Sequence, residues 1–139
     1  MAKKRVLIVE DEADTRLAIR GLLESAGYEA GEAADGTAGL AQAERVRPDV
    51  ILLDVLMPGL DGYEVCRRLK DNRATAAIPV IFLTAFPDLT LNRLAFEAGG
   101  VACITKPFRV EALVAVIEAA ITNAERRAKR KRKGGGRGH

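Results

Sequence analysis

The amino-acid sequence predicts an α/β fold in which five helices cover both faces of a five-stranded parallel sheet. Short runs of β-branched and other apolar residues alternate with longer stretches of helical apolar spacing, and this alternation repeats five times along the 139 residues. Several of the short runs are apolar almost throughout, as expected of strands that are buried on both faces. Strict strand–helix alternation of this kind is typical of a doubly wound parallel sheet.

Five segments have the length and composition of strands. Three are nearly continuous apolar runs, which suit the middle of a sheet. The second and the fifth are more weakly apolar and are expected nearer its edges. The predicted strands are residues 5–9 (RVLIV), 29–33 (EAGEA), 49–53 (DVILL), 79–83 (PVIFL) and 101–105 (VACIT).

The segments between the strands show helical patterns. The first two helices are predicted at residues 13–26, where Gly27 ends the helix, and at residues 37–46. A third is expected to begin at an Asp61 N-cap, a fourth to end at Gly99 and Gly100, and a fifth to run on toward the basic C-terminal segment. In chain order, the apolar positions that mark the helices are Leu17, Leu22 and Leu23; Leu40 and Ala43; Tyr63, Val65, Cys66 and Leu69; Leu91, Leu94 and Phe96; and Leu113, Val114, Ile117 and Ile121.

Composition narrows the class of protein. Apolar residues make up 48% of the chain and charged residues 29%, the balance of an ordinary globular domain. The N-terminal segment lacks the apolar core of a signal peptide, and no stretch approaches the ~20 apolar residues that a spanning helix needs. Two cysteines, Cys66 and Cys103, are too few for a disulfide framework and are expected as small buried apolar side chains. We therefore expect a cytoplasmic protein.

Charge is divided unevenly along the chain. The residues before Arg126 comprise 14 basic and 19 acidic side chains, a formal charge of −5, whereas residues 126–139 carry +8. The calculated pI of 9.1 therefore describes the C-terminal segment and not the acidic body. We expect residues 1–125 to form the domain and residues 126–139 to be a disordered, solvated tail. The alternative is a segment that binds nucleic acid or an acidic partner.

Polar side chains follow the predicted strands at one end of the sheet. Glu10 and Asp11 come after the first strand, Asp54 after the third, Thr84 after the fourth and Lys106 after the fifth. The carboxyl ends of parallel strands meet at the same end of a sheet, so these side chains are expected to share one crevice. Converging carboxylates favour a bound cation, and oxygen ligands favour Mg²⁺. A carboxylate beside Mg²⁺, an ammonium and a hydroxyl suits a phosphoryl acceptor.

Four motifs in this order resemble the receiver domain of bacterial response regulators. They are VLIVEDE (residues 6–12), LLDVLMPGLDG (52–62), FLTA (82–85) and TKPF (105–108). The resemblance extends over about residues 4–123. It implies a flavodoxin-like fold with strand order 2-1-3-4-5. It also implies that Asp54 accepts a phosphoryl group from a histidine kinase or phosphotransfer protein, with Mg²⁺ as the cofactor.

The resemblance assigns a role to each matching residue. Asp11 and Asp54 are implied as direct Mg²⁺ ligands with the backbone carbonyl of Leu56, and Glu10 as a ligand through water. Lys106 is implied to contact the phosphoryl group, and its bond to Pro107 to be cis. Two further residues complete the site: Thr84, implied to move inward after phosphorylation, and Ala85, a small residue that gives access to the phosphate.

The sequence departs from the family pattern at several positions. Cys103 replaces the aromatic residue whose rotation is usually coupled to the threonine, and Val101 and Ala102 replace a frequent acidic pair. We therefore expect an apolar docking surface on the fourth helix, fifth strand and fifth helix. Leu56 and Phe86 occupy the two positions that tune the lifetime of the phosphoryl group, and neither can orient water. Slow autodephosphorylation is the corresponding hypothesis.

The combined interpretation is a single-domain response regulator, which is phosphorylated but is not a turnover enzyme. Its expected partners are a histidine kinase or phosphotransfer protein, and a downstream effector or a second copy of itself. An aspartyl phosphatase of the haloacid-dehalogenase type is disfavoured, because Leu56 stands where such enzymes have their acid–base aspartate. The remaining alternative is a module that binds nucleic acid or an acidic partner through its basic tail, and no role is assigned to a membrane.

Overall fold

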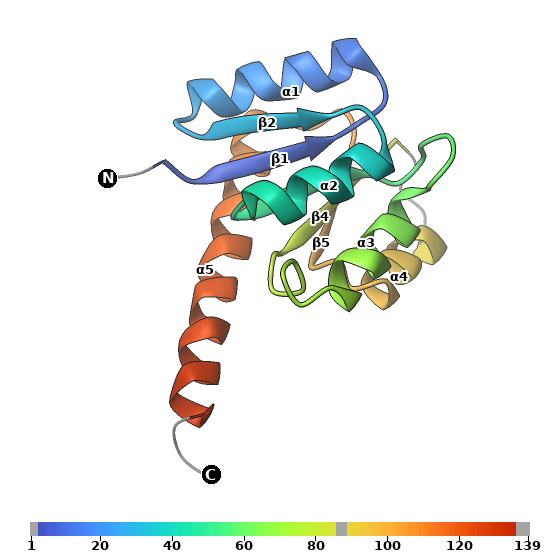
Figure 1. Cartoon of the computed structure of the whole chain (residues 1–139). Helices are drawn as coiled ribbons and strands as arrows, with labels where there is room; N and C mark the ends of the chain where they lie inside the picture. Colours follow the sequence, from blue (N-terminus) through green and yellow to red (C-terminus); the bar gives the residue numbers. More distant parts are fainter. Residues whose placement is uncertain (1–2, 86–88, 136–139) are drawn as a thin grey trace.

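The computed structural model describes residues 3–85 and 89–135, and five strands alternate with five helices along them (Figure 1). The strands are β1 (Arg5–Val9), β2 (Glu29–Ala33), β3 (Val50–Asp54), β4 (Val80–Thr84) and β5 (Ala102–Thr105). The helices are α1 (Ala13–Ser25), α2 (Gly36–Val46), α3 (Gly62–Asp71), α4 (Leu89–Glu97) and α5 (Val110–Gly135).

The strands form one parallel sheet with the order β2-β1-β3-β4-β5, which confirms the predicted fold class and topology. The two weakly apolar strands, β2 and β5, lie at its edges as expected. The three central strands are buried along nearly their whole length, with only Arg5 exposed at the start of β1. Strands β3 and β4 begin and end one residue later than predicted, so Asp54 and Thr84 are the last residues of their strands.

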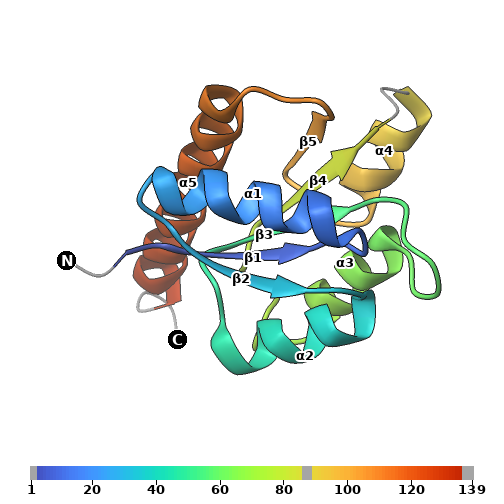
Figure 2. The same ribbon diagram turned by 90° about the horizontal axis from the view of Figure 1, so that it is seen from above.

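Two layers of helices pack on the sheet, each against its own apolar cluster (Figure 2). Alternate strand residues face opposite sides, so that Ile8, Leu52 and Leu83 join one cluster while Val9, Leu53 and Phe82 join the other. The first cluster includes residues of α1 and α5, and the second includes residues of α2, α3 and α4. Burial on both faces explains why the central strands are apolar at every position.

Two predicted helical faces are wrong in detail. In α1 the buried pair is Ile19 and Leu23, one turn apart, whereas Leu17 is 57% exposed and Leu22 is 38% exposed. In α4 the buried position is Ala95, followed by buried Ala98 directly after the helix, whereas Phe96 is 55% exposed. The sequence pattern predicts the larger side chains as core, but the helices pack on the sheet through smaller or differently spaced residues. The side chain of Leu91 lies outside the described residues.

The other helices follow the sequence pattern more closely. Val65, Cys66 and Leu69 of α3 are buried, as are Leu113, Ile117 and Ile121 of α5. The Asp61 carboxylate accepts a hydrogen bond from the Glu64 amide, which confirms the predicted N-cap. Gly27 has a φ of 95°, a backbone conformation that suits the glycine expected to end α1.

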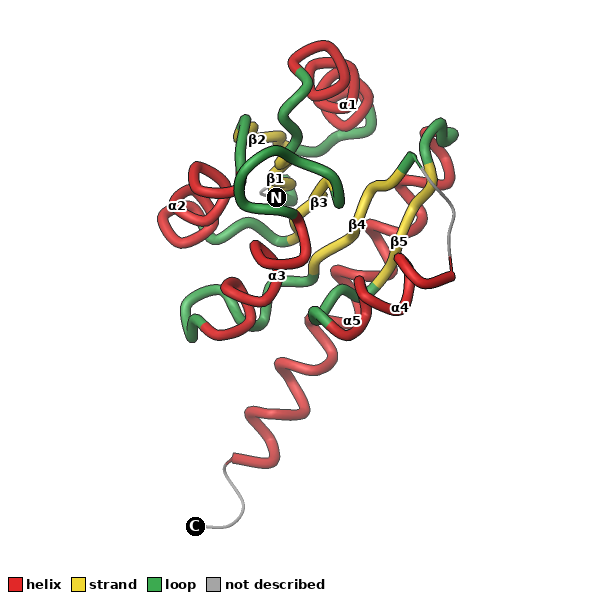
Figure 3. The backbone as a smooth tube through the Cα atoms, turned by 90° about the vertical axis from the view of Figure 1, so that its right-hand side faces the viewer, coloured by secondary structure: helices red, strands yellow, loops and turns green. Residues whose placement is uncertain are grey.

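The last helix extends well beyond the part of it that packs on the sheet. Residues 126–135, which were expected to belong to a disordered tail, continue α5 as far as Gly135 (Figure 3). Arginine, lysine and alanine are good helix formers, and basic residues near a helix C-terminus interact favourably with the helix dipole. Within the described residues, no helix is both long and apolar enough to cross a membrane.

Candidate functional site

The fold brings the predicted site residues together at the carboxyl end of the sheet. Asp54 and Thr84 are the last residues of β3 and β4, while Glu10 and Lys106 directly follow β1 and β5. Glu10 is 1% exposed, Thr84 1% and Asp54 8%, and they are three of the four polar side chains classed as buried among the described residues. These groups could be removed from water only if other parts of the chain surround and pair them.

Three carboxylates form the acidic part of the site. Oxygen atoms of Glu10, Asp11 and Asp54 all lie within 4.8 Å of one another. Asp11 is exposed, whereas the other two are buried, so the cluster opens to solvent on one side. Neighbouring carboxylates repel one another, and the repulsion is strongest where water is excluded. The cluster therefore favours a bound cation or a nearby positive charge.

Lys106, directly after β5, supplies a positive charge beside these carboxylates. Its Nζ lies 2.7 Å from Glu10 Oε1 and 3.5 Å from Asp54 Oδ2. Burial opposes the charged ammonium, but the hydrogen bond that it donates to Glu10 and the negative charges of Asp54 and Glu10 outweigh this, so the pKa of Lys106 is raised. The lysine stays protonated near neutral pH. The Lys106–Pro107 peptide bond is cis, as the motif implied.

Backbone groups fix the orientation of the two buried carboxylates. The Leu56 amide donates to Asp54 Oδ1 at 3.2 Å, and the Glu12 amide donates to Glu10 Oε2 at 3.4 Å. Asp54 therefore has one oxygen held by the backbone and the other facing Lys106. The Leu56 side chain is 55% exposed and stands at the rim of the site.

An arginine for which the sequence pattern made no prediction, Arg16, holds the backbone of the site in place through hydrogen bonds. Arg16 of α1 donates from Nη1 to the backbone carbonyl of Glu10 at 2.8 Å and from Nε to Glu32 Oε1 at 2.9 Å. Arg20 donates to the other oxygen of Glu32 at 2.6 Å. Glu10 is thus tied to β2 and α1 through Arg16. A helical arginine facing an edge strand gives no local signal of this role.

Gly62 begins α3 at a point where the helix comes very close to the backbone of β3. A Cβ atom at this position would lie 2.3 Å from the backbone oxygen of Asp54 and 3.0 Å from Val55 Cα. The Gly62 amide also donates to the Val55 carbonyl at 3.2 Å. The start of α3 therefore packs directly on the backbone that carries Asp54, and only glycine permits this approach.

Thr84 and Ala85 occupy the end of β4 beside the site. Thr84 is buried, and its carbonyl accepts a hydrogen bond from the Lys106 amide at 2.7 Å. This bond joins the two loops that carry the hydroxyl and the ammonium. Ala85, the small residue that follows Thr84, is exposed. Phe86, predicted to tune the lifetime of a phosphoryl group, lies outside the described residues.

The donor set suits a hard divalent cation. It consists of carboxylate oxygens, one of them exposed, and it contains neither histidine nor thiolate. Mg²⁺ prefers a small number of carboxylates with water in its other coordination positions, which this half-open cluster allows. Glu10, Asp11 and Asp54 are therefore the residues that would hold it. A metal here would neutralise charge on oxygens that approach Asp54.

The sequence matches the response regulator receiver domain family over residues 6–118. The chain therefore belongs to this family, whose members are signalling modules of two-component systems. The structure is similar to the chemotaxis protein CheY4 of Vibrio cholerae, with a TM-score of 0.82, 31% identity, and coverage of 86% of this chain and 99% of that one.

A second solved structure contains the metal. It is the receiver domain of a sensor histidine kinase from Pseudomonas aeruginosa PAO1, with magnesium in its active-site cleft. The two share 32% identity at a TM-score of 0.81, over 87% of this chain and 99% of the other.

Longer curated relatives contain the same domain. RpaA of Synechocystis, a DNA-binding transcriptional regulator, is 38% identical over 122 residues, which make up 88% of this chain and 51% of RpaA. PleD of Caulobacter vibrioides is 45% identical over 104 residues, or 74% of this chain and 23% of PleD. This chain thus spans about half the length of RpaA and about a quarter of PleD.

Proposed function

We propose that this receiver domain accepts a phosphoryl group on Asp54. The observation that carries the proposal is the geometry around this carboxylate. Asp54 lies at the carboxyl end of β3, within 4.8 Å of two other acidic side chains and 3.5 Å from the Lys106 ammonium. One of its oxygens accepts from the Leu56 amide, which leaves the other on the side of the ammonium.

The chemical step is a transfer between two acceptors. An Asp54 carboxylate oxygen attacks phosphorus and forms a P–O bond, while the bond from phosphorus to the donor breaks. A phosphohistidine of a histidine kinase or phosphotransfer protein leaves as the neutral imidazole after protonation, and acetyl phosphate leaves as acetate. Lys106 is placed to offset negative charge on the transferring oxygens. Glu10, Asp11 and Asp54 would hold the Mg²⁺ that assists this charge neutralisation.

The Thr84 hydroxyl would couple phosphorylation of Asp54 to a conformational change in the rest of the domain. A phosphoryl group adds charge and acceptor oxygens beside β4, and a hydroxyl that turns toward them would draw the following loop inward. Because the Thr84 carbonyl is bonded to the Lys106 amide, the loops after β4 and β5 would move together. Cys103 packs against the cluster that contains Phe82, and its small side chain would not swing as an aromatic ring does.

The surface formed by α4, β5 and α5 would bind the downstream partner. Between β5 and α5 lies a hollow of about 530 Å³, which is lined largely by apolar residues such as Val101, Ala102 and Val116 and also by Arg127 and Arg130. An apolar hollow of this kind suits an effector protein or a second copy of the domain. The partner would be selected by a change in the shape of this surface, since its floor carries no acidic residue in the part that the structure describes.

The test is phosphorylation by acetyl phosphate with and without Mg²⁺, followed by intact-mass measurement. The expected result is a metal-dependent gain of one phosphoryl mass, which is lost on treatment with hydroxylamine. Asp54→Asn is expected to abolish the gain. Asp61→Asn, which changes a carboxylate at the N-cap of α3, is the matched control and is expected to leave it intact. A gain that persists in Asp54→Asn would contradict the assignment.

The lifetime of the phosphoryl group is a separate part of the proposal. Leu56 stands exposed at the rim of the site and offers no side-chain hydrogen bond to an attacking water. We expect the double variant Leu56→Asn with Phe86→Glu to lose its phosphoryl group faster than the wild type. A lifetime that is unchanged or longer in this variant would argue against control by these two positions.

A further inference from the structure

The strongest concentration of charge outside the Asp54 site lies on the C-terminal part of α5. Arg126, Arg127, Lys129, Arg130 and Lys131 are all exposed, and no acidic residue follows Glu125 in the sequence. Among the residues that the structure describes, no carboxylate forms an ion pair with any of these five. By contrast, Arg67, Arg68 and Arg93 each pair with a glutamate on their own helix.

This positive charge is held in a helix despite mutual repulsion. Arg126 and Arg130, and likewise Arg127 and Lys131, are four residues apart and therefore neighbours on the helix surface. Like charges at this spacing destabilise a helix when nothing compensates them. A polyanion alongside α5 would remove the repulsion.

The cations of α5 form one wall of positive charge, and Lys70 and Arg73 form a second wall near the extended helix. Lys70 of α3 lies across a hollow of about 370 Å³ from Arg127 and Lys131, and the hollow is bordered by Ala76 and Ala128. Two Lys70 hydrogen bonds, to the carbonyls of Ala76 at 3.1 Å and of Ile78 at 2.6 Å, hold the ammonium at this position. Burial and, to a smaller extent, the nearby Arg127 guanidinium lower the pKa of Lys70.

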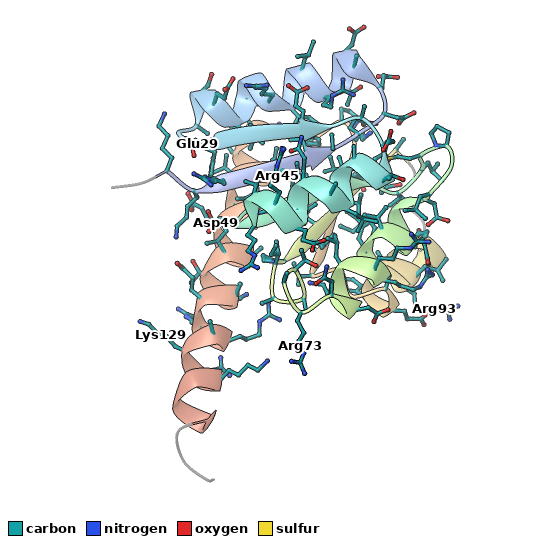
Figure 4. The ribbon with its side chains drawn as sticks, in the orientation of Figure 1. Glu29, Arg45, Asp49, Arg73, Arg93 and Lys129 are labelled. Atoms are coloured by element: carbon teal, nitrogen blue, oxygen red, sulfur yellow. The ribbon has the colours of Figure 1, made fainter. Side chains whose placement is uncertain are left out.

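The loop between α3 and β4 extends this second wall. Figure 4 shows Arg73 on this loop, directed away from the sheet on the side where α5 projects, while Lys129 lies on the far side of α5. Arg73 is exposed, and no acidic side chain pairs with it in the described part of the chain. The loop and the projecting part of α5 lie at the same end of the molecule in Figures 1 and 3.

We propose that a basic surface binds the phosphate backbone of duplex DNA. It is formed by Lys70, Arg127 and Lys131 around the hollow of about 370 Å³, by Arg73 on the loop, and by Arg130, which lines the neighbouring hollow together with Arg127. Duplex DNA presents about one negative charge per 1.7 Å along its axis, which can engage several of these cations at once. The small residues Ala76 and Ala128 leave the hollow between the two walls open to a backbone strand.

The chemistry of the surface favours a duplex over other polyanions. No aromatic residue follows Phe108 in the sequence, so the extended helix offers no platform on which single-stranded bases could stack. An acidic protein would need an apolar anchor, and the hollow beside Lys70 offers little of one, because apart from its three cations it is lined by alanine, glycine and Val101. The contacts would be made to phosphates and would therefore be independent of sequence.

Phosphate binding of this kind has a measurable signature. For about five phosphate contacts, affinity is expected to fall roughly 500-fold between 50 and 200 mM salt, because bound counterions are released. The experiment measures binding of the full unphosphorylated chain to two fluorescent duplexes of unrelated sequence across this salt range. Equal affinities for the two duplexes are expected. Since no phosphoryl donor is present, the result does not depend on the role proposed for Asp54.

Two triple variants distinguish binding by this surface from a general effect of the protein's net charge. The triple variant Arg127→Gln, Arg130→Gln, Lys131→Gln keeps good helix formers and is expected to reduce the salt dependence to roughly 10-fold over the same range. The control triple variant Arg67→Gln, Arg68→Gln, Arg93→Gln removes the same charge from paired arginines and is expected to retain most of the salt dependence. Circular dichroism checks that α5 remains helical in both.

Arg73→Gln tests whether the second wall takes part. One lost phosphate contact should lower the slope of log affinity against log salt by about 1. An unchanged slope in Arg73→Gln would leave α5 as an isolated polycation and overturn the proposed surface. So would equal losses in the two triple variants, tighter binding to polyglutamate than to DNA, or an absence of DNA binding at 50 mM salt.

Discussion

The two ends of the sheet use charge in opposite ways. At the carboxyl end, Glu10, Asp54 and Lys106 are few, largely buried and paired at 2.7 and 3.5 Å. At the amino end, Arg73 and five cations of α5 are exposed and form no ion pair among the described residues; the five are Arg126, Arg127, Lys129, Arg130 and Lys131. Buried charges depend on exact placement because no water compensates an error, whereas exposed charges act additively and are screened by salt. Substitutions should therefore have large, specific effects at the first end and small ones at the second.

The largest effect is expected for Gly62→Ala. Its Cβ would lie 2.3 Å from the Asp54 carbonyl oxygen, so the start of α3 and the backbone of β3 would have to separate. We expect a loss of about 3 kcal/mol in the free energy of unfolding, together with slower phosphorylation of Asp54. Urea unfolding and acetyl phosphate labelling measure the two effects.

A second glycine provides the control for this substitution. Gly21 lies inside α1, and a Cβ there would meet nothing within 4 Å. Gly21→Ala is expected to stabilise the protein by about 0.5–1 kcal/mol through the higher helix propensity of alanine. If both variants shifted stability in the same direction, the contact between Gly62 and Asp54 would not be the cause.

The next effect concerns Lys106. Lys106→Gln leaves three carboxylates within 4.8 Å without their ammonium and should cost about 2 kcal/mol, less than for a fully buried pair because the lysine is 23% exposed. Mg²⁺ should then raise the melting temperature of the variant more than that of the wild type, since a cation binds best where charge is uncompensated. Calorimetry with and without Mg²⁺ tests this, and equal shifts in the two proteins would count against a shared site.

A smaller effect is expected at Glu32, which pairs with Arg20 and with Arg16, the residue that binds the Glu10 carbonyl. The hydrogen bond from Arg20, with a further one from Arg16, lowers the pKa of Glu32 below its unfolded value, although burial acts in the opposite direction. A lowered folded-state pKa gives stability above the unfolded pKa that is lost as pH falls through the folded one. Glu32→Gln should therefore cost about 1 kcal/mol at pH 7 and almost nothing at strongly acidic pH. A difference from the wild type that persists in acid would exclude the ion pair as its source.

The smallest effect belongs to the amino end. Arg127→Gln with Lys131→Gln should change the free energy of unfolding by less than about 0.5 kcal/mol, and in the stabilising direction at low salt because repulsion along α5 is relieved. Thermal melts at low and high salt measure this. A clear destabilisation would mean that these cations make contacts within the folded domain, and the contrast between the two ends would fail.

Local patterns were sufficient for most of the fold. Apolar runs identified all five strands to within one residue, and Gly27 and Asp61 marked helix boundaries through their own conformational preferences. Helix faces were less accurate, because large side chains such as Leu17 and Phe96 were taken as core although they are exposed. Side-chain size alone does not reveal which face of a helix meets the sheet, because α4 is buried at Ala95 whereas α1 is buried at Ile19 and Leu23.

What the sequence by itself determined is the alternation of strands and helices and, through it, which residues end each strand. The polar groups of the site follow from that alone, because parallel strands place their carboxyl ends together. Tertiary structure decided the rest. Lys106 meets Glu10 across 96 residues of chain, Arg16 reaches Glu10 from a helix face, and Gly62 packs on the backbone of Asp54. These contacts join segments whose approach depends on the packing of the whole domain, and no local preference encodes them.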